Sequence, residues 1–150
     1  MANNELETFY QPRVSVSDNQ LVGYEALVRW RHPELGLVSP VEFIPVAEET
    51  GQILDIGFWV LNDACRQMAR WRSNGWQICV SINIAALQFQ KSDLVSNVQK
   101  AIEYSGLEPS ALELEITEGT LINNIEHTRE VILKLKNIGV RIALDDFGTG

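Results

Sequence analysis

The predicted fold follows from one stretch of the chain, Gly23-Tyr24-Glu25-Ala26-Leu27-Val28-Arg29-Trp30-Arg31-His32-Pro33. Side chains of a β-strand alternate between two faces, and this alternation predicts a strand that leads into a loop. One predicted face is apolar and comprises Val22, Tyr24, Ala26, Val28 and Trp30. The other holds Gly23, Glu25, Leu27 and Arg29. A charge on a buried face is costly unless it is paired or binds a metal. Glu25 and Arg29 therefore either pair with each other or belong to a site.

The composition is that of a globular domain with a substantial core. The chain has 150 residues, of which 45% are hydrophobic and 21% charged. Its first seven residues do not have the basic and apolar regions of a signal peptide, and it contains neither an apolar run of the ~20 residues that a membrane helix needs nor a CxxC motif. We therefore expect a cytoplasmic domain without a membrane segment. The net charge of −8 disfavours binding of polymeric nucleic acid, but permits a small anionic ligand held through metal ions.

Alternating strand and helix signals predict a parallel sheet covered by helices. We expect residues 1–8 to be a lead-in, and residues 9–16 to pair with the Glu25 strand as an antiparallel hairpin. The helix start signals Ser39, Pro40 and Glu42 open the first helix. The predicted helices cover residues 40–50, 53–72, 92–104 and 125–137. The predicted later strands cover residues 78–84, 112–116 and 140–145.

Each of four strands carries a polar residue near its carboxyl end, on the face opposite to the apolar one: Glu25, Asn83, Glu115 and Asp145. In a barrel of parallel strands that face points inward, and the strand ends build the active site. Asp146 follows directly and extends the set. These oxygen donors suit Mg²⁺ or Mn²⁺ better than Zn²⁺. We expect His32, in a loop, and His127, on a helix surface, to be structural.

The ordered motifs resemble the EAL family of bacterial cyclic di-GMP phosphodiesterases, named after the triplet Glu25-Ala26-Leu27. The resemblance covers residues 9–150. Its pieces are Phe9-Tyr10-Gln11-Pro12, Gly23–Trp30, Ser39–Pro45, Ser81-Ile82-Asn83, Glu115-Ile116-Thr117-Glu118 and Asp145-Asp146-Phe147-Gly148-Thr149-Gly150.

The resemblance implies a TIM-type (β/α)8 barrel with an antiparallel first strand, of which this chain supplies about the first half. It implies that Glu25, Asn83, Glu115 and Asp145 hold one divalent ion and that Asp145 and Asp146 share a second. Gln11, Leu27 and Arg29 would bind the substrate, with Gln11 on a guanine and Arg29 on a phosphate. Glu118 would anchor the loop after Asp146.

The implied chemistry is two-metal hydrolysis of cyclic di-GMP to linear pGpG, in which the ions activate a water and clamp the phosphate. The resemblance also implies a homodimer and regulatory or GGDEF-type domains in a parent protein. The family's later lysine, glutamate and glutamine have no counterpart in these 150 residues. We therefore expect the isolated chain to be inactive and not a well-behaved monomer.

Two other functions fit parts of the pattern. A catalytically inactive EAL domain that serves as a cyclic di-GMP receptor would share most of these motifs, and residues beyond 150 would distinguish it from an enzyme. An unrelated metal-dependent TIM-barrel lyase would explain the carboxylates at the strand ends, but not the ordered motifs.

Overall fold

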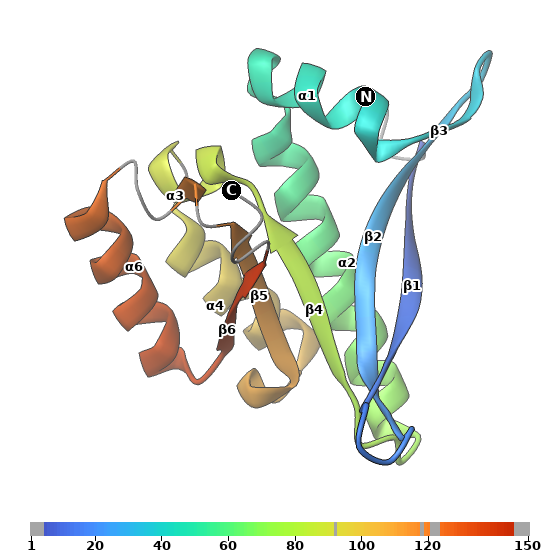
Figure 1. The fold of residues 1–150 in the computed structure, drawn as a ribbon, viewed down its shortest axis with the longest axis vertical. Helices are drawn as coiled ribbons and strands as arrows, with labels where there is room; N and C mark the ends of the chain where they lie inside the picture. Colours follow the sequence, from blue (N-terminus) through green and yellow to red (C-terminus); the bar gives the residue numbers. More distant parts are fainter. Residues whose placement is uncertain (1–4, 92, 118, 121–123, 146–150) are drawn as a thin grey trace.

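The computed structural model describes residues 5–91, 93–117, 119–120 and 124–145. Five strands of its sheet lie in the order β1-β2-β4-β5-β6, and β3 pairs with β2. The strands are β1 (Leu6–Val14), β2 (Leu21–His32), β3 (Gly36–Val38), β4 (Cys79–Ile84), β5 (Leu112–Thr117) and β6 (Arg141–Asp145) (Figure 1). The described helices are α1 (Pro40–Thr50), α2 (Ile53–Ser73), α3 (Ala86–Lys91), α4 (Leu94–Ser105), η1 (a 3-10 helix, Pro109–Ala111) and α6 (Ile125–Ile138).

Strands β1 and β2 form the predicted antiparallel hairpin, with Gln11 opposite Glu25. Residues 6–8, expected to belong to a lead-in, are part of β1, and the strand ends at Val14 rather than at residue 16. The early start is stabilised by charged groups that pair across the hairpin. Arg31 donates to both carboxylate oxygens of Glu7, at 2.6 and 2.8 Å, so an acidic residue is compatible with the strand.

The remaining long strands run parallel to one another, as predicted. Neighbouring strands β2 and β4, β4 and β5, and β5 and β6 all pair in parallel register. Strand β1 is therefore antiparallel to the rest and lies at the edge of the described sheet. This position accommodates Pro12, which has no N–H to donate to a neighbouring strand.

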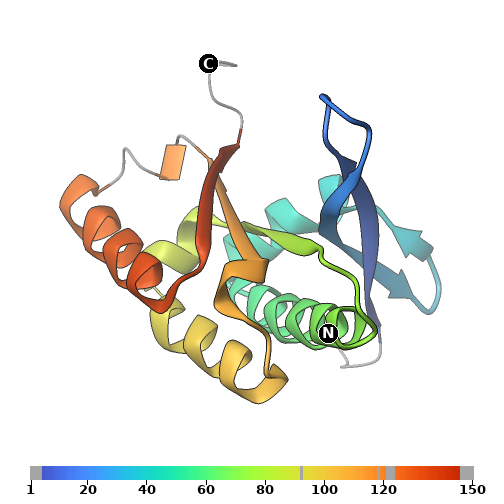
Figure 2. The ribbon, with the colours of Figure 1, turned by 90° about the horizontal axis from the view of Figure 1, so that it is seen from below.

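One face of this sheet packs against the helices. Helices α2, α4 and α6 lie together on that side, and the strands curve away from them as an open trough (Figure 2). The helix-facing side chains of β4 and β5 are at most 3% exposed: Val80, Ile82, Ile84, Leu112, Leu114 and Ile116. The alternation of apolar residues in the sequence therefore predicted this core correctly.

Two local features complete the framework around the carboxyl ends of the strands. Helix α1 begins after Ser39, whose N–H donates to the Glu42 carboxylate at 3.2 Å, and it ends at Gly51, which has a φ of 78°. The sequence did not predict the short helix α3, which follows β4 directly. The buried Gln88 stabilises its start by accepting a hydrogen bond from the Ala85 N–H at 2.9 Å.

Within the described ranges, no helix combines the length and the apolar character that a membrane crossing requires.

Candidate functional site

The strand register brings three of the predicted site residues to the same end of the sheet. Asn83 of β4 lies beside Glu115 of β5, and Glu25 of β2 lies beside Ser81, two residues before Asn83. Because the strands are parallel, their carboxyl ends meet at one edge, and the three side chains share the face that the helices do not cover. The shared face was thus predicted correctly, but Glu25 lies in the first half of β2 (Leu21–His32) and not near its carboxyl end as predicted, because β2 continues to His32.

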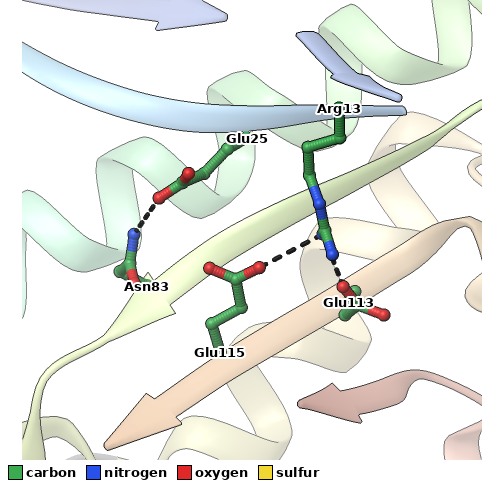
Figure 3. A network of polar contacts seen from close by, with 5 residues as sticks. All are labelled: Arg13, Glu25, Asn83, Glu113 and Glu115. Atoms are coloured by element: carbon green, nitrogen blue, oxygen red, sulfur yellow. Dashed lines mark hydrogen bonds and ion pairs between the residues drawn. The ribbon is translucent and has the colours of Figure 1, made fainter. Parts of the chain in front are cut away.

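Glu25 and Asn83 are in direct contact. The Asn83 amide Nδ2 donates to Glu25 Oε1 at 2.8 Å (Figure 3). A carboxylate and an amide from two different strands are thereby held together. This arrangement requires the parallel pairing of β2 and β4, which sets the height of both side chains along the strands.

Glu115 belongs to an ionic network on the same face. The Arg13 guanidinium donates from one nitrogen to Glu113 Oε1 at 2.6 Å and to Glu115 Oε1 at 3.1 Å. The Glu113 and Glu115 side chains are 19% and 12% exposed and that of Arg13 is 42% exposed, so the carboxylates are better sheltered from solvent than the guanidinium. The hydrogen bond to Glu113 and the nearby carboxylates raise the pKa of Arg13 further, which keeps the guanidinium charged.

A pocket of about 250 Å³ opens beside these residues. Its polar wall includes Arg29, Asn83 and Glu115, and Leu27 also lines it. Its apolar wall comes from the helices behind the strand ends, through Ile44, Ile53 and Ile56. A pocket with a mainly apolar lining and a few convergent polar groups has the composition of a small-molecule site.

Arg29 does not pair with Glu25 among the described contacts. Its guanidinium donates to the carbonyl of Val28 at 2.9 Å and lies over the ring of Phe9, 5.5 Å from the centroid. The sequence had left an internal Glu25–Arg29 ion pair open, and the structure rules that pairing out. Gln11 is exposed on β1, opposite Glu25 in the hairpin.

The remaining predicted residues cannot be placed in the same detail. The backbone of Asp145 ends β6, where it pairs with Thr117 of β5. Glu118 and Asp146 lie outside the described residues, as does the side chain of Asp145. The second half of the predicted metal set therefore stays a prediction.

The described donors fit a hard divalent cation by their chemistry. Glu25 and Glu115 supply carboxylate oxygens and Asn83 an amide, the groups that Mg²⁺ and Mn²⁺ prefer. Within the described part of the chain, no three His, Cys, Asp or Glu side chains gather into a metal-binding group. A metal site here would consequently need the Asn83 amide together with Asp145, the last residue of β6.

Both histidines make structural contacts. His32, predicted to lie in a loop, is the last residue of β2, and its Nδ1 accepts from the N–H groups of Glu34 and Leu35 at 3.1 and 3.2 Å. His127 lies exposed near the start of α6, with Nε2 3.0 Å from the carbonyl oxygen of Phe89. Neither residue lines the pocket beside Asn83.

Sequence reasoning missed Arg13 and Glu113. The signal was present, because Arg13 has the same strand parity as Gln11, and Glu113 has the same parity as Glu115. What the sequence did not show was that the curvature of the sheet lets a side chain of edge strand β1 reach β5. The apolar wall from α1 and α2 was also missed, because its residues look like ordinary core.

Comparisons with known proteins agree with this geometry. The EAL domain family model matches residues 1–150. The chain is 44% identical, over its whole length, to the bifunctional diguanylate cyclase/cyclic di-GMP phosphodiesterase MucR of Pseudomonas aeruginosa, and spans 22% of that protein. The solved PaMucR phosphodiesterase in complex with c-di-GMP superposes with a TM-score of 0.93, over 97% of this chain and 60% of the solved one.

A second solved structure extends the likeness beyond one protein. The EAL enzyme Bd1971, with cAMP and cyclic di-GMP bound, is 34% identical and superposes with a TM-score of 0.90. The alignment covers 99% of this chain and 42% of that one, so the chain spans about half of the solved proteins it matches. The described strands thus form part of an EAL-type TIM barrel, as predicted. With a family model that matches every residue and structural neighbours of this closeness, the chain belongs to the EAL domain family.

Proposed function

We propose that this chain supplies the first part of an EAL phosphodiesterase domain that hydrolyses cyclic di-GMP to linear pGpG. The observation that carries the proposal is the hydrogen bond between Asn83 and Glu25, beside a pocket lined by Leu27, Arg29, Asn83 and Glu115. Metal-type oxygen donors and a cation suited to phosphate thereby occupy one end of the sheet. MucR, which is named a cyclic di-GMP phosphodiesterase, is 44% identical over the same residues.

In this proposal Glu25, Asn83, Glu115 and Asp145 hold one Mg²⁺ or Mn²⁺ ion, and Asp145 and Asp146 share a second. When bound, such a metal pair supplies Lewis-acid activation of water and charge neutralisation at the phosphate. The chain's own residues set the geometry. The Asn83 amide keeps Glu25 in place, and the parallel strand pairing fixes the height of Glu115 relative to both.

Arg29 is the proposed phosphate contact. Its guanidinium lines the pocket and donates only to a backbone carbonyl among the described contacts, so a phosphate would add charge-assisted hydrogen bonds to it. Gln11 is the proposed contact to a guanine, and Leu27 is a further proposed substrate contact. The positive charge of Arg29 matters because the chain as a whole has a net charge of −8, which by itself repels a dinucleotide with two phosphates.

The decisive experiment compares two polypeptides in a chromatographic assay for pGpG with Mg²⁺. One is the 150-residue chain, and the other is the same chain continued by the remainder of the MucR EAL barrel. We expect turnover from the continued chain and none from the chain alone, because the family's later catalytic groups lie beyond residue 150. Light scattering on the chain alone tests the expectation that it is not a well-behaved monomer.

Glu25→Ala in the continued chain should abolish hydrolysis, since it removes a proposed metal ligand. Arg29→Ala should weaken cyclic di-GMP binding, measured by calorimetry, more than it weakens Mn²⁺ binding. Binding of cyclic di-GMP without turnover by the continued chain would instead identify a receptor module. Equal loss of both affinities in Arg29→Ala would make Arg29 a structural residue.

A further inference from the structure

We propose that Arg13 is a positioning residue for Glu115, which it holds in the geometry that binds the metal. The inference rests on the proposed function, because Glu115 matters there as a ligand. Arg13 itself touches neither of the other described donors, Glu25 and Asn83, through a hydrogen bond. It would therefore act through Glu115 alone.

The contact spans the open side of the sheet. Arg13 belongs to edge strand β1, whereas Glu113 and Glu115 belong to β5, and strands β2 and β4 lie between them in the sheet. Figure 3 shows the Arg13 side chain extending across to the two carboxylates, next to the Glu25–Asn83 pair. One guanidinium thus connects the first and fourth strands in the order β1-β2-β4-β5.

Small residues leave room for this crossing. The register places Gly23 of β2 opposite Arg13, and Ser81 of β4 beside Glu113. Ser81 faces the side of the sheet that the helices do not cover, yet it is only 1% exposed, and its hydroxyl has no hydrogen-bond partner among the described residues. The face of the sheet that carries these ion pairs is therefore shielded from solvent at Ser81, two residues before Asn83.

The pattern of the bonds suits a supporting role. Arg13 makes its shorter bond, 2.6 Å, to Glu113 and its longer one, 3.1 Å, to a single oxygen of Glu115. Glu113 anchors the guanidinium and Glu115 is oriented by it. Partners that orient a metal ligand commonly change metal affinity 10–100-fold when removed.

The direction in which Mn²⁺ affinity changes when Arg13 is replaced distinguishes a positioning role from simple charge repulsion. A positive charge close to a cation site disfavours metal binding, so removal of that charge alone should tighten Mn²⁺ binding. Loss of positioning should weaken it, because Glu115 would lose one of the bonds that hold it in place, and more of its ordering would fall to metal binding. We expect the second effect to dominate, with an affinity for Mn²⁺ about tenfold weaker in Arg13→Met.

The test is calorimetric titration of the continued chain and its variants with Mn²⁺, at a temperature where circular dichroism shows each one folded. Arg13→Lys keeps the charge but on a shorter side chain, which reaches the two carboxylates less well, and we expect an intermediate affinity. The matched control is Arg31→Met. Arg31 forms a similar ion pair with Glu7, at 2.6 Å on the same hairpin, and is remote from Glu115 by register. Its loss should leave Mn²⁺ affinity unchanged.

Each outcome decides something different. Unchanged or tighter Mn²⁺ binding in both Arg13 variants, with a wild-type chain that binds Mn²⁺, overturns the positioning role and leaves the proposed function intact. A wild-type chain that binds no Mn²⁺ overturns the metal site, and with it this inference. An equal loss in Arg31→Met would show that any weakening of the hairpin has the same effect, which would also overturn it.

Discussion

The two faces of the sheet differ in nearly every physical property. On the helix-facing side, side chains such as Ile82 and Leu114 are at most 1% exposed and make only apolar contacts with the core cluster. On the opposite side, two ion pairs and a carboxylate–amide hydrogen bond connect β1, β2, β4 and β5. Both faces come from the same strands, because successive side chains along a strand point to opposite sides of the sheet.

This difference separates stability from chemistry. Burial of apolar area contributes most of the free energy of folding, so the helix-facing side can stabilise the sheet without the polar side. The polar side can then hold carboxylates close together, although their mutual repulsion lowers the free energy of unfolding. We therefore expect substitutions on one face to change stability, and substitutions on the other to change ligand affinity.

The largest stability effect should come from Leu114→Ala, in the fully buried centre of β5. Loss of a buried leucine side chain removes apolar contacts and leaves a cavity, which typically costs about 3 kcal/mol. Urea denaturation followed by circular dichroism measures this change. The matched control is Leu133→Ala on α6, where the leucine is 51% exposed and the expected loss is within about 0.5 kcal/mol. Similar losses at the two positions would contradict the assignment of the core.

A second effect concerns pH and the buried face of α2. Burial raises the pKa of the Cys65 thiol from 9.0 to about 12. Between these values the unfolded chain loses its thiol proton while the folded chain keeps it. The free energy of unfolding should therefore fall as pH rises from 9 towards 12, by about 1 kcal/mol per pH unit from this group.

Comparison with Cys65→Ala isolates that contribution, because the other titrating groups are common to both proteins. The slope of stability against pH should be shallower in the variant. Burial also raises the pKa of Tyr10, and its contribution, which has the same sign, remains in both. Identical slopes would mean that Cys65 is accessible to solvent in the folded state.

Gly57→Ala should lower the stability of the protein, although the higher helix propensity of alanine alone would raise it. Alanine in place of glycine normally stabilises a helix by up to about 1 kcal/mol. Here an added Cβ on α2 would lie 2.1 Å from the side-chain nitrogen of Gln88. The buried amide must move, which disturbs its bond to the Ala85 N–H, so we expect a net destabilisation of about 1 kcal/mol.

The double variant Gly57→Ala/Gln88→Ala tests the cause. If the clash explains the loss, the second substitution removes it, and the two effects will be less than additive in urea denaturation. Full additivity would indicate that Gly57 acts through the backbone instead.

The sequence predicted the face of each strand better than it predicted contacts between strands. Parity placed Glu25, Asn83 and Glu115 on one face, and the structure brings Glu25 and Asn83 into contact. Arg13 and Glu113 have the strand parity of that face too, but parity could not reveal their 2.6 Å bond, which depends on sheet curvature. The start of β1 was missed because Glu7 looks unfavourable until its partner Arg31 is seen.

The smallest effect on stability should come from Glu25→Gln, although it is expected to have a large effect on metal binding. Glutamine has the same shape and its side-chain oxygen can still accept the hydrogen bond from Asn83 Nδ2, so the free energy of unfolding should change by no more than about 0.5 kcal/mol. Loss of the carboxylate charge should weaken Mn²⁺ binding at least about tenfold, because a ligand should matter no less than its outer partners. Urea denaturation and calorimetric titration on the same preparation measure both quantities. A clear loss of stability with unchanged Mn²⁺ affinity would make Glu25 a structural residue of the sheet. It would contradict the expectation that substitutions on the polar face change ligand affinity rather than stability.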